Sequence, residues 1–502
     1  MDLRLDSVSW RCRRLDTDRR GGADNPFWFS CRYHQIQSLD GKGGMNMKFF
    51  STRQGMIVFV LGFLMVMVMA FCFRWAPIYD AAQYEHLGWN LSQGNGLSNS
   101  IAPPFVLTAD REPLYPFFIS IIYRIFGRHY GCVYIAQGFL VALSSLLTFK
   151  LAGRFFCQRI AFLAGILVAA DPTISGFAGQ FWTESLALFL LISFIYMMAV
   201  FKEERPFLFA LSGGALIGLL TLCRAVFMLM PLAVAALLIF SKHQPLKKRL
   251  LQVVALMAAF TIIVGPWIYR NKKEFNVPSI TTRSGHLLLW RALRTEYTPK
   301  DMLIHLSYGA SDTLGRRLFP GEYSRMSVRG VWGPENIYEK GARMYLDYLA
   351  RGYSEFEADR MLQLEAVNII KKHPAMYVLQ SFLELWKLSF FEVVPFAYSD
   401  KYKQLMQGGA TFYVIGKMLR VGLRYYYSWL IIALAAVGLI RGHRSLDGRK
   451  SVFLLPIVYV IITAMPLNAG PRYLCPALPF IMIFAAAAFF DQDLSGFKER
   501  SP

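Results

Sequence analysis

Long stretches without charged residues recur along this chain and constrain its fold more than any other feature. The clearest are Met56–Phe73, Ser185–Phe201, Val226–Phe240 and Val452–Pro466. A helix needs roughly 20 apolar residues to cross the hydrocarbon core of a bilayer, and these runs approach that length. The chain is only 17% charged, whereas soluble domains carry about a quarter. The sequence therefore predicts an all-α polytopic membrane protein, with about 10–13 transmembrane or juxtamembrane helices and a mixed external segment.

The net charge of +21 would suit a nucleic-acid partner only if the basic residues formed a continuous face. Many of them lie instead in short loops between apolar runs, namely Lys242, Lys247, Lys248, Arg249, Arg441, Arg444, Arg449 and Lys450. Lys and Arg in such loops set the orientation of a membrane protein. We therefore expect membrane lipids, and no nucleic acid, as partners.

The basic loops also predict the direction of each crossing. Lys48 and Arg53 precede the first apolar run, which indicates a cytoplasmic N-terminus. We predict spans near 56–73, 131–151, 160–179, 182–201, 206–222, 223–240, 250–268, 425–440, 452–467 and 474–490. With these spans, all strongly basic short loops lie on the cytoplasmic side. Two further apolar segments would break this alternation as full spans. Leu114–Phe126 is too short and is interpreted as juxtamembrane or re-entrant, and the charged segment Val378–Pro395 as interfacial.

The predicted organisation has five parts: an N-terminal tail at 1–55, a transmembrane module at 56–268 with a first external loop at 74–113, an extracytoplasmic segment at 269–377, a second transmembrane module at 378–490 and a cytoplasmic tail at 491–502. The external segment shows helical patterning around Glu335–Lys372. The N-terminal tail lacks the apolar region and cleavage site of a signal peptide. It is either a disordered basic tail or a stretch upstream of a true start at Met45 or Met47.

Acids and arginines gather at the predicted external face. They come from six separate parts of the chain and comprise Asp80, Asp110, Arg111, Asp171, Glu184, Arg224, Arg270 and Arg472. Ionisable groups at membrane depth or at its edge are costly and are usually functional. Their convergence indicates that an anionic ligand is handled at this surface.

Asp80 opens a short amphipathic stretch in the first external loop. Tyr84, Leu87 and Leu91 follow it at helical spacing, and Gly94–Gly96 (Gly-Asn-Gly) predicts the end of the helix. Free backbone N–H groups at a helix start keep a carboxylate ionised. Asp80 is therefore either an N-cap and nothing more, or a fixed base that takes a proton from an acceptor hydroxyl.

Arg111 and Arg224 each have a functional and a structural interpretation. Arg111, in ADREPLYPFF, could clamp a phosphate with two hydrogen bonds or extend to the membrane interface. Arg224 lies in a tight turn between apolar runs, where phosphate binding competes with an ion pair to Glu184 or Asp171. Glu184 itself stands at a helix start and could be only a cap.

For the other polar residues, a structural explanation is favoured over a functional one when each residue is considered alone. Arg270 and Arg472 lie at the edges of apolar runs, where interfacial anchoring is common. His86, His286 and His305 have no HExxH-like spacing, so solvated histidines are favoured over a metal site.

Six segments in order resemble one known family: YDAAQYEHLGWNLSQGNGL, REPLYPFFISIIYRIFG, FWTESLALFLLISF, LTLCRAVF, GPWIYRN and PRYLCPALP. Together they are similar to the membrane glycosyltransferases of the C superfamily. The nearest branch is that of the bacterial protein mannosyltransferase-like and aminoarabinose-transferase-like enzymes. The resemblance runs from about residue 56 to 490.

The resemblance implies a multi-pass enzyme of the bacterial inner (plasma) membrane with a periplasmic active site. Such enzymes move a sugar from a polyprenyl-phosphate donor to a glycolipid, polysaccharide or protein acceptor. Their first external loop carries the catalytic Asp, which matches Asp80 here as general base. By position, the arginines that would hold the donor phosphate are Arg111, Arg224, Arg270 and Arg472, supported by Tyr84, Asp110, Glu184 and Tyr473.

The resemblance leaves the cofactor open. Some members carry a second acid beside the catalytic Asp, or bind a divalent metal. Here Tyr79 precedes Asp80 and Ala81 follows it, which puts metal dependence and kinship to the eukaryotic protein mannosyltransferases in doubt. GxGxxG and Walker sequences are absent, and none is required, because arginines can neutralise a lipid phosphate as it leaves.

Two other functions stay open from the sequence. A transporter or flippase of a lipid-linked glycan would normally carry polar residues at mid-bilayer, often in related halves. Here the charges lie at one edge and no internal repeat is visible. A scaffold for envelope assembly is the third alternative.

Overall fold

The computed structural model describes residues 43–490 apart from 74–75, 78–79, 241–243, 311–314, 316, 321–336, 390–417, 419–421, 443–449 and 467–470. The chain divides into two compact units, Met1–Thr52 and Arg53–Pro502. In the first unit, the described residues are the opening turns of helix α1 (Gly43–Cys72). Residues 1–42 of the predicted N-terminal tail and all of the predicted C-terminal tail at 491–502 lie outside the described residues.

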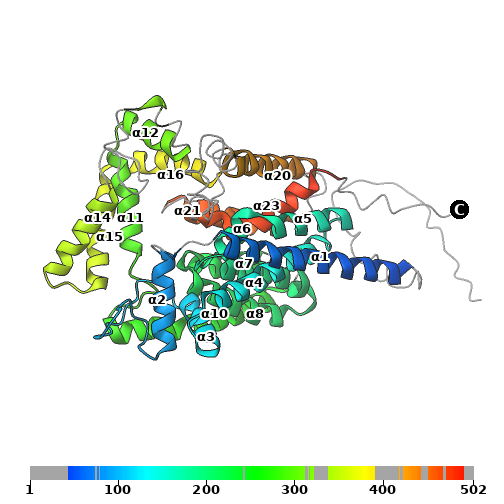
Figure 1. Cartoon of the computed structure of the whole chain (residues 1–502), viewed down its shortest axis with the longest axis horizontal. Helices are drawn as coiled ribbons and strands as arrows, with labels where there is room; N and C mark the ends of the chain where they lie inside the picture. Colours follow the sequence, from blue (N-terminus) through cyan, green and yellow to red (C-terminus); the bar gives the residue numbers. More distant parts are fainter. Residues whose placement is uncertain are drawn as a thin grey trace, which may run out of the picture. The chain divides into compact units, whose positions relative to one another are not determined.

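The second unit is helical throughout its described residues, apart from loops and one isolated β-bridge between Ser98 and Leu107 (Figure 1). Four helices are long and apolar enough to cross a membrane: α1, α4 (Tyr130–Ala152), α8 (Pro206–Cys223) and α10 (Leu246–Phe275). The bent pair α5 (Gln158–Ala170) and α6 (Pro172–Ala178) would make a fifth span. The prediction of an all-α polytopic membrane protein is confirmed.

Shorter apolar helices occupy most of the remaining predicted spans and the predicted juxtamembrane segment Leu114–Phe126. They are α3 (Leu114–Phe126), α7 (Glu184–Glu204), the 3-10 turn η1 (Ala225–Leu229) with α9 (Met230–Phe240), α20 (Ser428–Gly442), α21 (Leu454–Ala464), and the consecutive α22 (Pro471–Leu474), η7 (Cys475–Ala477) and α23 (Leu478–Ala487). The π-helical turn η4 (Gly422–Tyr427) precedes α20, and the 3-10 turn η6 (Lys450–Phe453) precedes α21. In place of Val378–Pro395 the structure has α16 (Pro374–Leu388), and residues from 390 onward lie outside the description.

The predicted span at 160–179 consists of two helices and is not one continuous helix. It bends by 46° between α5 and α6. The Asp171 side chain accepts a hydrogen bond from the Ile174 N–H at 2.7 Å, and Pro172 occupies the first position of α6. An N-cap followed by proline starts a new helix, because proline has no N–H to continue the old one.

The membrane core is built around α7, which packs against α4 and α8. Helix α8 in turn packs closely on α10, and small residues make that approach possible. A Cβ on Gly214 would lie 2.2 Å from the Leu256 carbonyl oxygen, so a larger residue would push the helices apart. Because α7 starts at Glu184 and α8 ends just before Arg224, this packing brings those two residues to the same end of the core.

Helix α2 (Asp80–Ser92) starts at the predicted residue and packs on α3. Tyr84 and Leu87 are buried as their spacing predicted, and Leu91 is half-buried. A Cβ on Gly88 would lie 2.4 Å from the Ile119 side chain, so α2 and α3 are in close contact there. The helix ends before Gly94 and Gly96, which both adopt left-handed φ angles, +82° and +74°.

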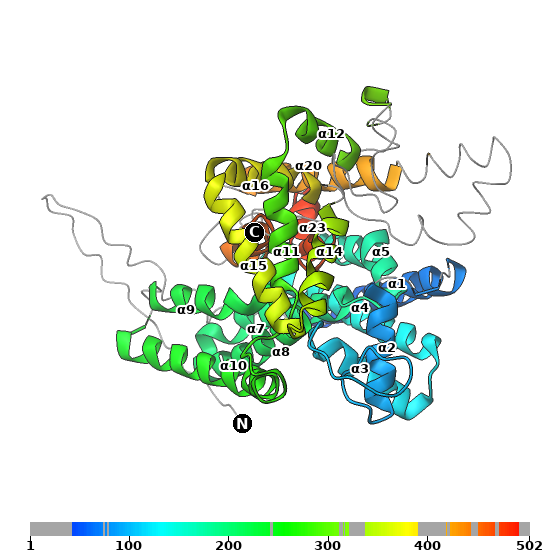
Figure 2. The ribbon, with the colours of Figure 1, turned by 90° about the vertical axis from the view of Figure 1, so that its left-hand side faces the viewer.

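The described residues of the segment predicted to be external form a small helical layer of their own, which we call the external layer. It contains α11 (Ser284–Leu293), the turn η2 (Arg294–Glu296), α12 (Pro299–Ala310), α14 (Ile337–Ala350) and α15 (Glu355–Lys372). Figure 2 shows α11, α14 and α15 side by side, with α11 and α15 in contact along their length. The helical patterning predicted around Glu335–Lys372 corresponds to α14 and α15, and the Ser354–Glu357 capping box explains where α15 begins.

Hydrogen bonds join the loop after α2, predicted to be external, to this layer and to α10. Thr108 Oγ1 donates to Glu355 Oε2 at 3.0 Å, and the Thr282 N–H donates to the Ala109 carbonyl at 3.1 Å. Arg270 Nη1 donates to the Thr108 carbonyl at 3.2 Å. The loop that follows α2 is therefore held against the residues that lead into α11 and α15.

Candidate functional site

Asp80 lies at the centre of a cluster of arginines from distant parts of the chain. Arg111 Nη2 donates a short hydrogen bond to Asp80 Oδ1, and Arg472 Nη1 donates to Oδ2 at 2.8 Å. Arg283 Nη1 lies 3.7 Å from Oδ1. Arg111 precedes α3, Arg283 precedes α11 and Arg472 belongs to α22. The carboxylate therefore joins the first loop, the external layer and the C-terminal helices.

The charge state of Asp80 follows from these neighbours. Burial by itself would raise the pKa of the carboxyl group, because the interior disfavours the charged form. Arg111, Arg472 and Arg283 together outweigh burial and hold the pKa of Asp80 well below its usual range. Asp80 is thus ionised at physiological pH, and the guanidinium groups are the cause.

A second carboxylate, Glu184, continues the cluster into the protein. Glu184 is fully buried, and Arg224 Nη1 donates to its Oε1 at 2.9 Å. Arg472 Nε lies 2.7 Å from the same oxygen, so Arg472 forms ion pairs with both Glu184 and Asp80. The interfacial interpretations of Arg111 and Arg472 are wrong, because each side chain is turned inward to a carboxylate.

Each of the three inner arginines also lies over an aromatic ring: Arg111 over Tyr84 at 5.0 Å, Arg224 over Tyr473 at 5.0 Å and Arg472 over Trp182 at 4.4 Å from guanidinium carbon to ring centroid. Cation–π contact holds the plane of a guanidinium while leaving its edge N–H groups available. The rings thus fix the directions in which these arginines can donate.

Two predicted members of the cluster have other partners. Asp171 caps α6 and accepts a hydrogen bond from the Tyr427 hydroxyl at 2.7 Å, so it stabilises the bend between α5 and α6. Arg270 lies over the rings of Trp267 and Phe275 and binds the Thr108 carbonyl, so it ties the first loop to α10.

Arg283 was not anticipated from the sequence. Its Nε donates to Asp110 Oδ1 at 2.8 Å, and Gln83 of α2 donates to the other oxygen of Asp110. Arg111 Nε donates to Gln83 Oε1 at 2.7 Å, which closes a network between Asp110 and Asp80. Burial would raise the pKa of Asp110, but Arg283 and Arg111 lower it overall. Nothing in the sequence links position 283 to position 110, apart from their common assignment to external segments.

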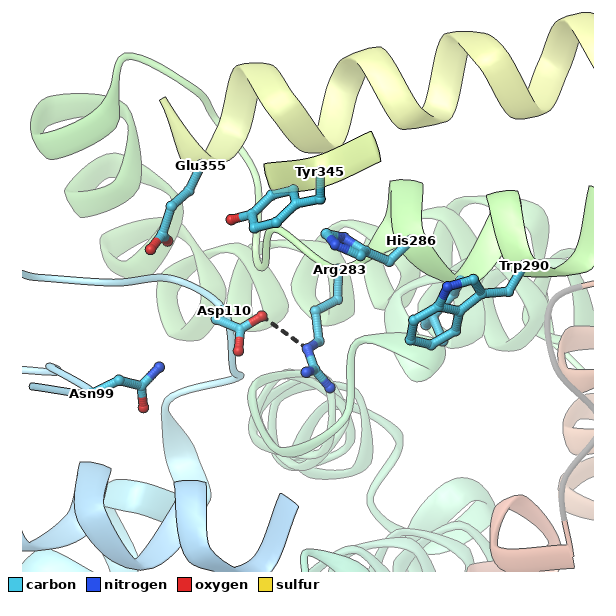
Figure 3. Close-up of a pocket in the computed structure, with 8 residues that line it drawn as sticks. Asn99, Asp110, Arg283, His286, Trp290, Tyr345 and Glu355 are labelled. Atoms are coloured by element: carbon cyan, nitrogen blue, oxygen red, sulfur yellow. Dashed lines mark hydrogen bonds and ion pairs between the residues drawn. The ribbon is translucent and has the colours of Figure 1, made fainter. Parts of the chain in front are cut away.

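A pocket of about 320 Å³ opens beside Arg283 (Figure 3). The first loop contributes one wall and the external helices α11, α14 and α15 contribute the others. The lining residues are Asn99, Asp110, Arg283, His286, Leu287, Trp290, Tyr345 and Glu355. Of these, Asp110 and His286 were considered from the sequence, and no recognisable motif marks the other lining residues.

His286 corrects the prediction of solvated histidines. Its Nδ1 lies 2.9 Å from Asp359 Oδ1, and its side chain is only 18% exposed. Asp359 also accepts the N–H groups of Gly285 and His286 at 2.9 and 3.1 Å, so one carboxylate holds the start of α11 and the ring. His305 is likewise buried, edge-on to Tyr297, because α12 turns it inward.

The residues around Asp80 do not suit a divalent cation. In the part of the chain that the structure describes, no three His, Cys, Asp or Glu side chains form a group that could hold one. The Asp80 oxygens face guanidinium groups, whose positive charges would repel a metal ion placed there.

Comparisons with known proteins found one family and several solved structures that are similar to this chain. Residues 110–269 match the model of the dolichyl-phosphate-mannose-protein mannosyltransferase family. No curated protein matches the chain. Among solved structures, similar chains include the Archaeoglobus fulgidus oligosaccharyltransferase in complex with Zn and sulfate, with 15% identity, a TM-score of 0.45 and coverage of 86% of this chain and 48% of that one.

Two further structures are similar at the same level. AglB from Archaeoglobus fulgidus, in complex with an inhibitory peptide and a dolichol-phosphate, shares 14% identity with a TM-score of 0.46, covering 88% of this chain and 50% of that one. ArnT from Cupriavidus metallidurans, bound to undecaprenyl phosphate, shares 13% identity with a TM-score of 0.39, covering 86% and 76%. The chain thus spans about half the length of the archaeal oligosaccharyltransferases.

The family match contains part of the charged cluster. It includes Asp110, Arg111, Glu184 and Arg224, and it ends one residue before Arg270. Two of the six sequence motifs, those with Asp80 and Arg472, lie outside it. Over residues 110–269 the match confirms the resemblance of this chain to the membrane glycosyltransferases of the C superfamily.

Proposed function

We propose that this protein is a glycosyltransferase that moves a sugar from a polyprenyl-phosphate-linked donor to an acceptor at the external face of the membrane. The observation that carries the proposal is the ion-pair cluster in which Asp80 meets Arg111, Arg472 and Arg283. The family match over residues 110–269 supports the same class of reaction.

The donor phosphate would bind to Arg111 and Arg472. Arginine suits a phosphate because its parallel N–H groups match two phosphate oxygens. Both guanidinium groups now donate to Asp80, so an entering phosphate would take over some of these hydrogen bonds. Arg224 is buried against Glu184, which suits a residue that positions Arg472 rather than one that contacts the donor.

This exchange gives Asp80 its role as a general base. A carboxylate paired to arginines has a low pKa and is a weak base. When the phosphate draws Arg111 and Arg472 away, the pKa of Asp80 rises and the carboxylate can accept a proton. Asp80 would then become an effective base only when the donor is in place.

In the transfer step, the acceptor hydroxyl oxygen forms a bond to the anomeric carbon of the donor sugar. The bond from that carbon to the phosphate oxygen breaks, and its electron pair stays on the lipid phosphate. Arg111 and Arg472 stabilise the charge that develops there. Asp80 takes the proton of the acceptor hydroxyl, so the step is balanced without a nucleotide.

The test is complementation of a deletion strain, read by mass spectrometry of its envelope glycolipids and glycoproteins. The wild-type gene should restore a missing sugar, and Asp80→Asn should not, although it inserts into the membrane at the normal level. Full complementation by Asp80→Asn would remove Asp80 from the catalytic step. Movement of a labelled lipid-linked sugar across proteoliposomes without a glycosidic product would favour the transporter instead.

A further inference from the structure

The pocket between the first loop and the external helices shares two residues with the cluster around Asp80. Asp110 and Arg283 line the pocket, and Arg283 also lies 3.7 Å from Asp80 through its Nη1. A molecule in the pocket would therefore border the residue that has to meet the acceptor hydroxyl. The pocket is therefore the space next to the donor phosphate that Arg111 and Arg472 would hold.

The aromatic side chains of the pocket form a connected surface. The rings of His286 and Tyr345 have centroids 4.5 Å apart, and those of His286 and Trp290 are 6.0 Å apart. Figure 3 shows these three residues along one side, opposite Asn99 and Asp110. Aromatic walls with a few fixed polar groups are typical of small-molecule sites, and flat rings suit the C–H face of a sugar.

Three side chains of the pocket contribute hydrogen-bond acceptors: Asn99, Asp110 and Glu355. Asn99 Oδ1 is buried and, among the described residues, has no hydrogen-bond partner. Glu355 Oε2 accepts from Thr108, and Asp110 adds a second carboxylate. Buried acceptors gain most from a ligand that donates several hydrogen bonds, as the hydroxyl groups of a sugar do.

The charges of the pocket argue against an anionic ligand. Asp110 and Glu355 contribute two carboxylates, and Arg283, which also lines the pocket, already pairs with Asp110. An additional phosphate would face these carboxylates and would have to compete with Asp110 for Arg283. Burial raises the pKa of Glu355 and the charge of Asp110 adds to this effect, while the hydrogen bond from Thr108 lowers the pKa in part.

We propose that this pocket is the acceptor subsite and that it binds a neutral carbohydrate, the terminal sugar of a glycolipid or polysaccharide. This inference rests on the proposed function. Of the three acceptor classes, glycolipid, polysaccharide and protein, it keeps the two that present a carbohydrate. The volume of about 320 Å³ lies at the lower end of small-molecule pockets, which suits about one or two sugar rings.

The experiment measures sugar binding and lipid-phosphate binding separately on the purified full-length protein in detergent. Saturation-transfer NMR would probe methyl α-D-mannopyranoside, methyl α-D-glucopyranoside and methyl β-D-galactopyranoside. At least one should bind with a Kd of about 1–10 mM. Trp290→Ala should weaken that binding roughly tenfold or more, and Glu355→Gln roughly fivefold.

Matched controls exist on the same helices. Glu357, two residues after Glu355, is exposed, and Gln at that position keeps the capping box, so Glu357→Gln should leave sugar binding unchanged. Leu346→Ala, on the exposed side of α14 next to Tyr345, should also be neutral.

The outcomes separate the two proposals. Undetectable binding of every glycoside at roughly 50 mM, or binding that Trp290→Ala leaves unchanged, would overturn the carbohydrate subsite. Stronger binding of a neutral threonine-containing peptide at the same residues would overturn it in favour of a protein acceptor. Failure of undecaprenyl phosphate to bind the wild-type protein would instead refute the proposed function, whatever the glycosides do.

Discussion

The cluster around Asp80 and the pocket beside it are built on opposite principles, although Arg283 belongs to both. In the cluster, Asp80 and Glu184 meet arginines at 2.7–2.9 Å, and the arginines rest on aromatic rings. In the pocket, Asn99 presents a buried acceptor that lacks a partner among the described residues, and the rings line open space. A ligand of the cluster has to replace existing ion pairs, whereas a ligand of the pocket can donate to Asn99 Oδ1 without breaking a hydrogen bond among the described residues.

This difference predicts where a mutation acts. Removing one partner from a buried ion pair leaves a charge without compensation and costs about 3–5 kcal/mol. Replacing a pocket side chain leaves these ion pairs in place, so its main effect should be on the ligand of the pocket. Changes in the cluster should therefore alter stability and donor binding together, and changes in the pocket should alter acceptor binding more than stability.

The largest effect on stability and on donor binding is expected for Arg472→Ala. This substitution removes a partner from both Asp80 and Glu184, so stability should fall by about 3–5 kcal/mol. Undecaprenyl phosphate should bind roughly 100-fold more weakly, because one of the two arginines that hold it is lost. Thermal unfolding and equilibrium binding in detergent measure both effects. Arg124→Ala, an arginine at the exposed end of α3, is the control, and a loss of stability without a loss of binding would confine Arg472 to structure.

Asp80→Asn should separate binding from catalysis. The substitution removes the carboxylate that competes with the phosphate for Arg111 and Arg472, so undecaprenyl phosphate should bind about 5–10-fold more tightly. Turnover should fall by about 10²–10⁴ because the base is lost. Weaker lipid-phosphate binding in this variant would show that Asp80 organises the arginines instead of competing with the donor.

Arg224→Ala should act indirectly through Glu184. The loss of the 2.9 Å ion pair leaves Glu184 to compete for Arg472, which then holds the donor less well. We expect a donor KM raised roughly tenfold with a smaller change in kcat. Arg224→Lys keeps the charge and should recover part of the effect. Unchanged KM and kcat in Arg224→Ala would remove it from the site.

The cluster and the pocket should also contribute to stability with opposite dependence on pH. The depressed pKa of Asp80 means that its contribution to stability is present above its unfolded pKa of about 3.9 and is lost as the pH falls through the folded value. The raised pKa of Glu355 has the opposite consequence. The contribution of Glu355 to stability is present below its unfolded pKa of about 4.3 and is lost as the pH rises through the folded value. Melting temperatures from pH 4 to 8 should therefore show Glu355→Gln gaining on the wild type toward neutral pH. The deficit of Asp80→Asn should stay constant from pH 5 to 8.

The sequence predicts one of these regions much better than the other. Apolar runs and the basic loops between them place helix ends such as those bearing Glu184 and Arg224, so charged residues near one face can be recognised together. Which acid forms an ion pair with which arginine at that face cannot be predicted, because a long side chain can reach several neighbours. Arg283 shows the limit: it lies in a polar segment where neither periodicity nor orientation fixes a contact.

The structural role of Asp171 could have been predicted from its neighbour Pro172. Its place on the predicted external side grouped it with the arginines, yet Asp followed by Pro172 is a strong helix-start signal. The pocket has no comparable signal, since its walls come from the loop after α2 and from three external helices. Sites formed between segments without a repeating pattern need the tertiary structure.

The smallest effect is expected for Arg270→Ala, and it tests where the cluster ends. Arg270 lies over Trp267 and Phe275 and binds the Thr108 carbonyl, which leads by hydrogen bonds to Glu355 and the pocket. Loss of a cation–π contact costs about 0.5–1 kcal/mol, so stability should fall only slightly. Undecaprenyl phosphate should bind within about twofold of the wild type, while glycoside binding weakens because the first loop is held less firmly. A large loss of lipid-phosphate binding would place Arg270 with the donor arginines, and the boundary between the two regions would then run through the first loop.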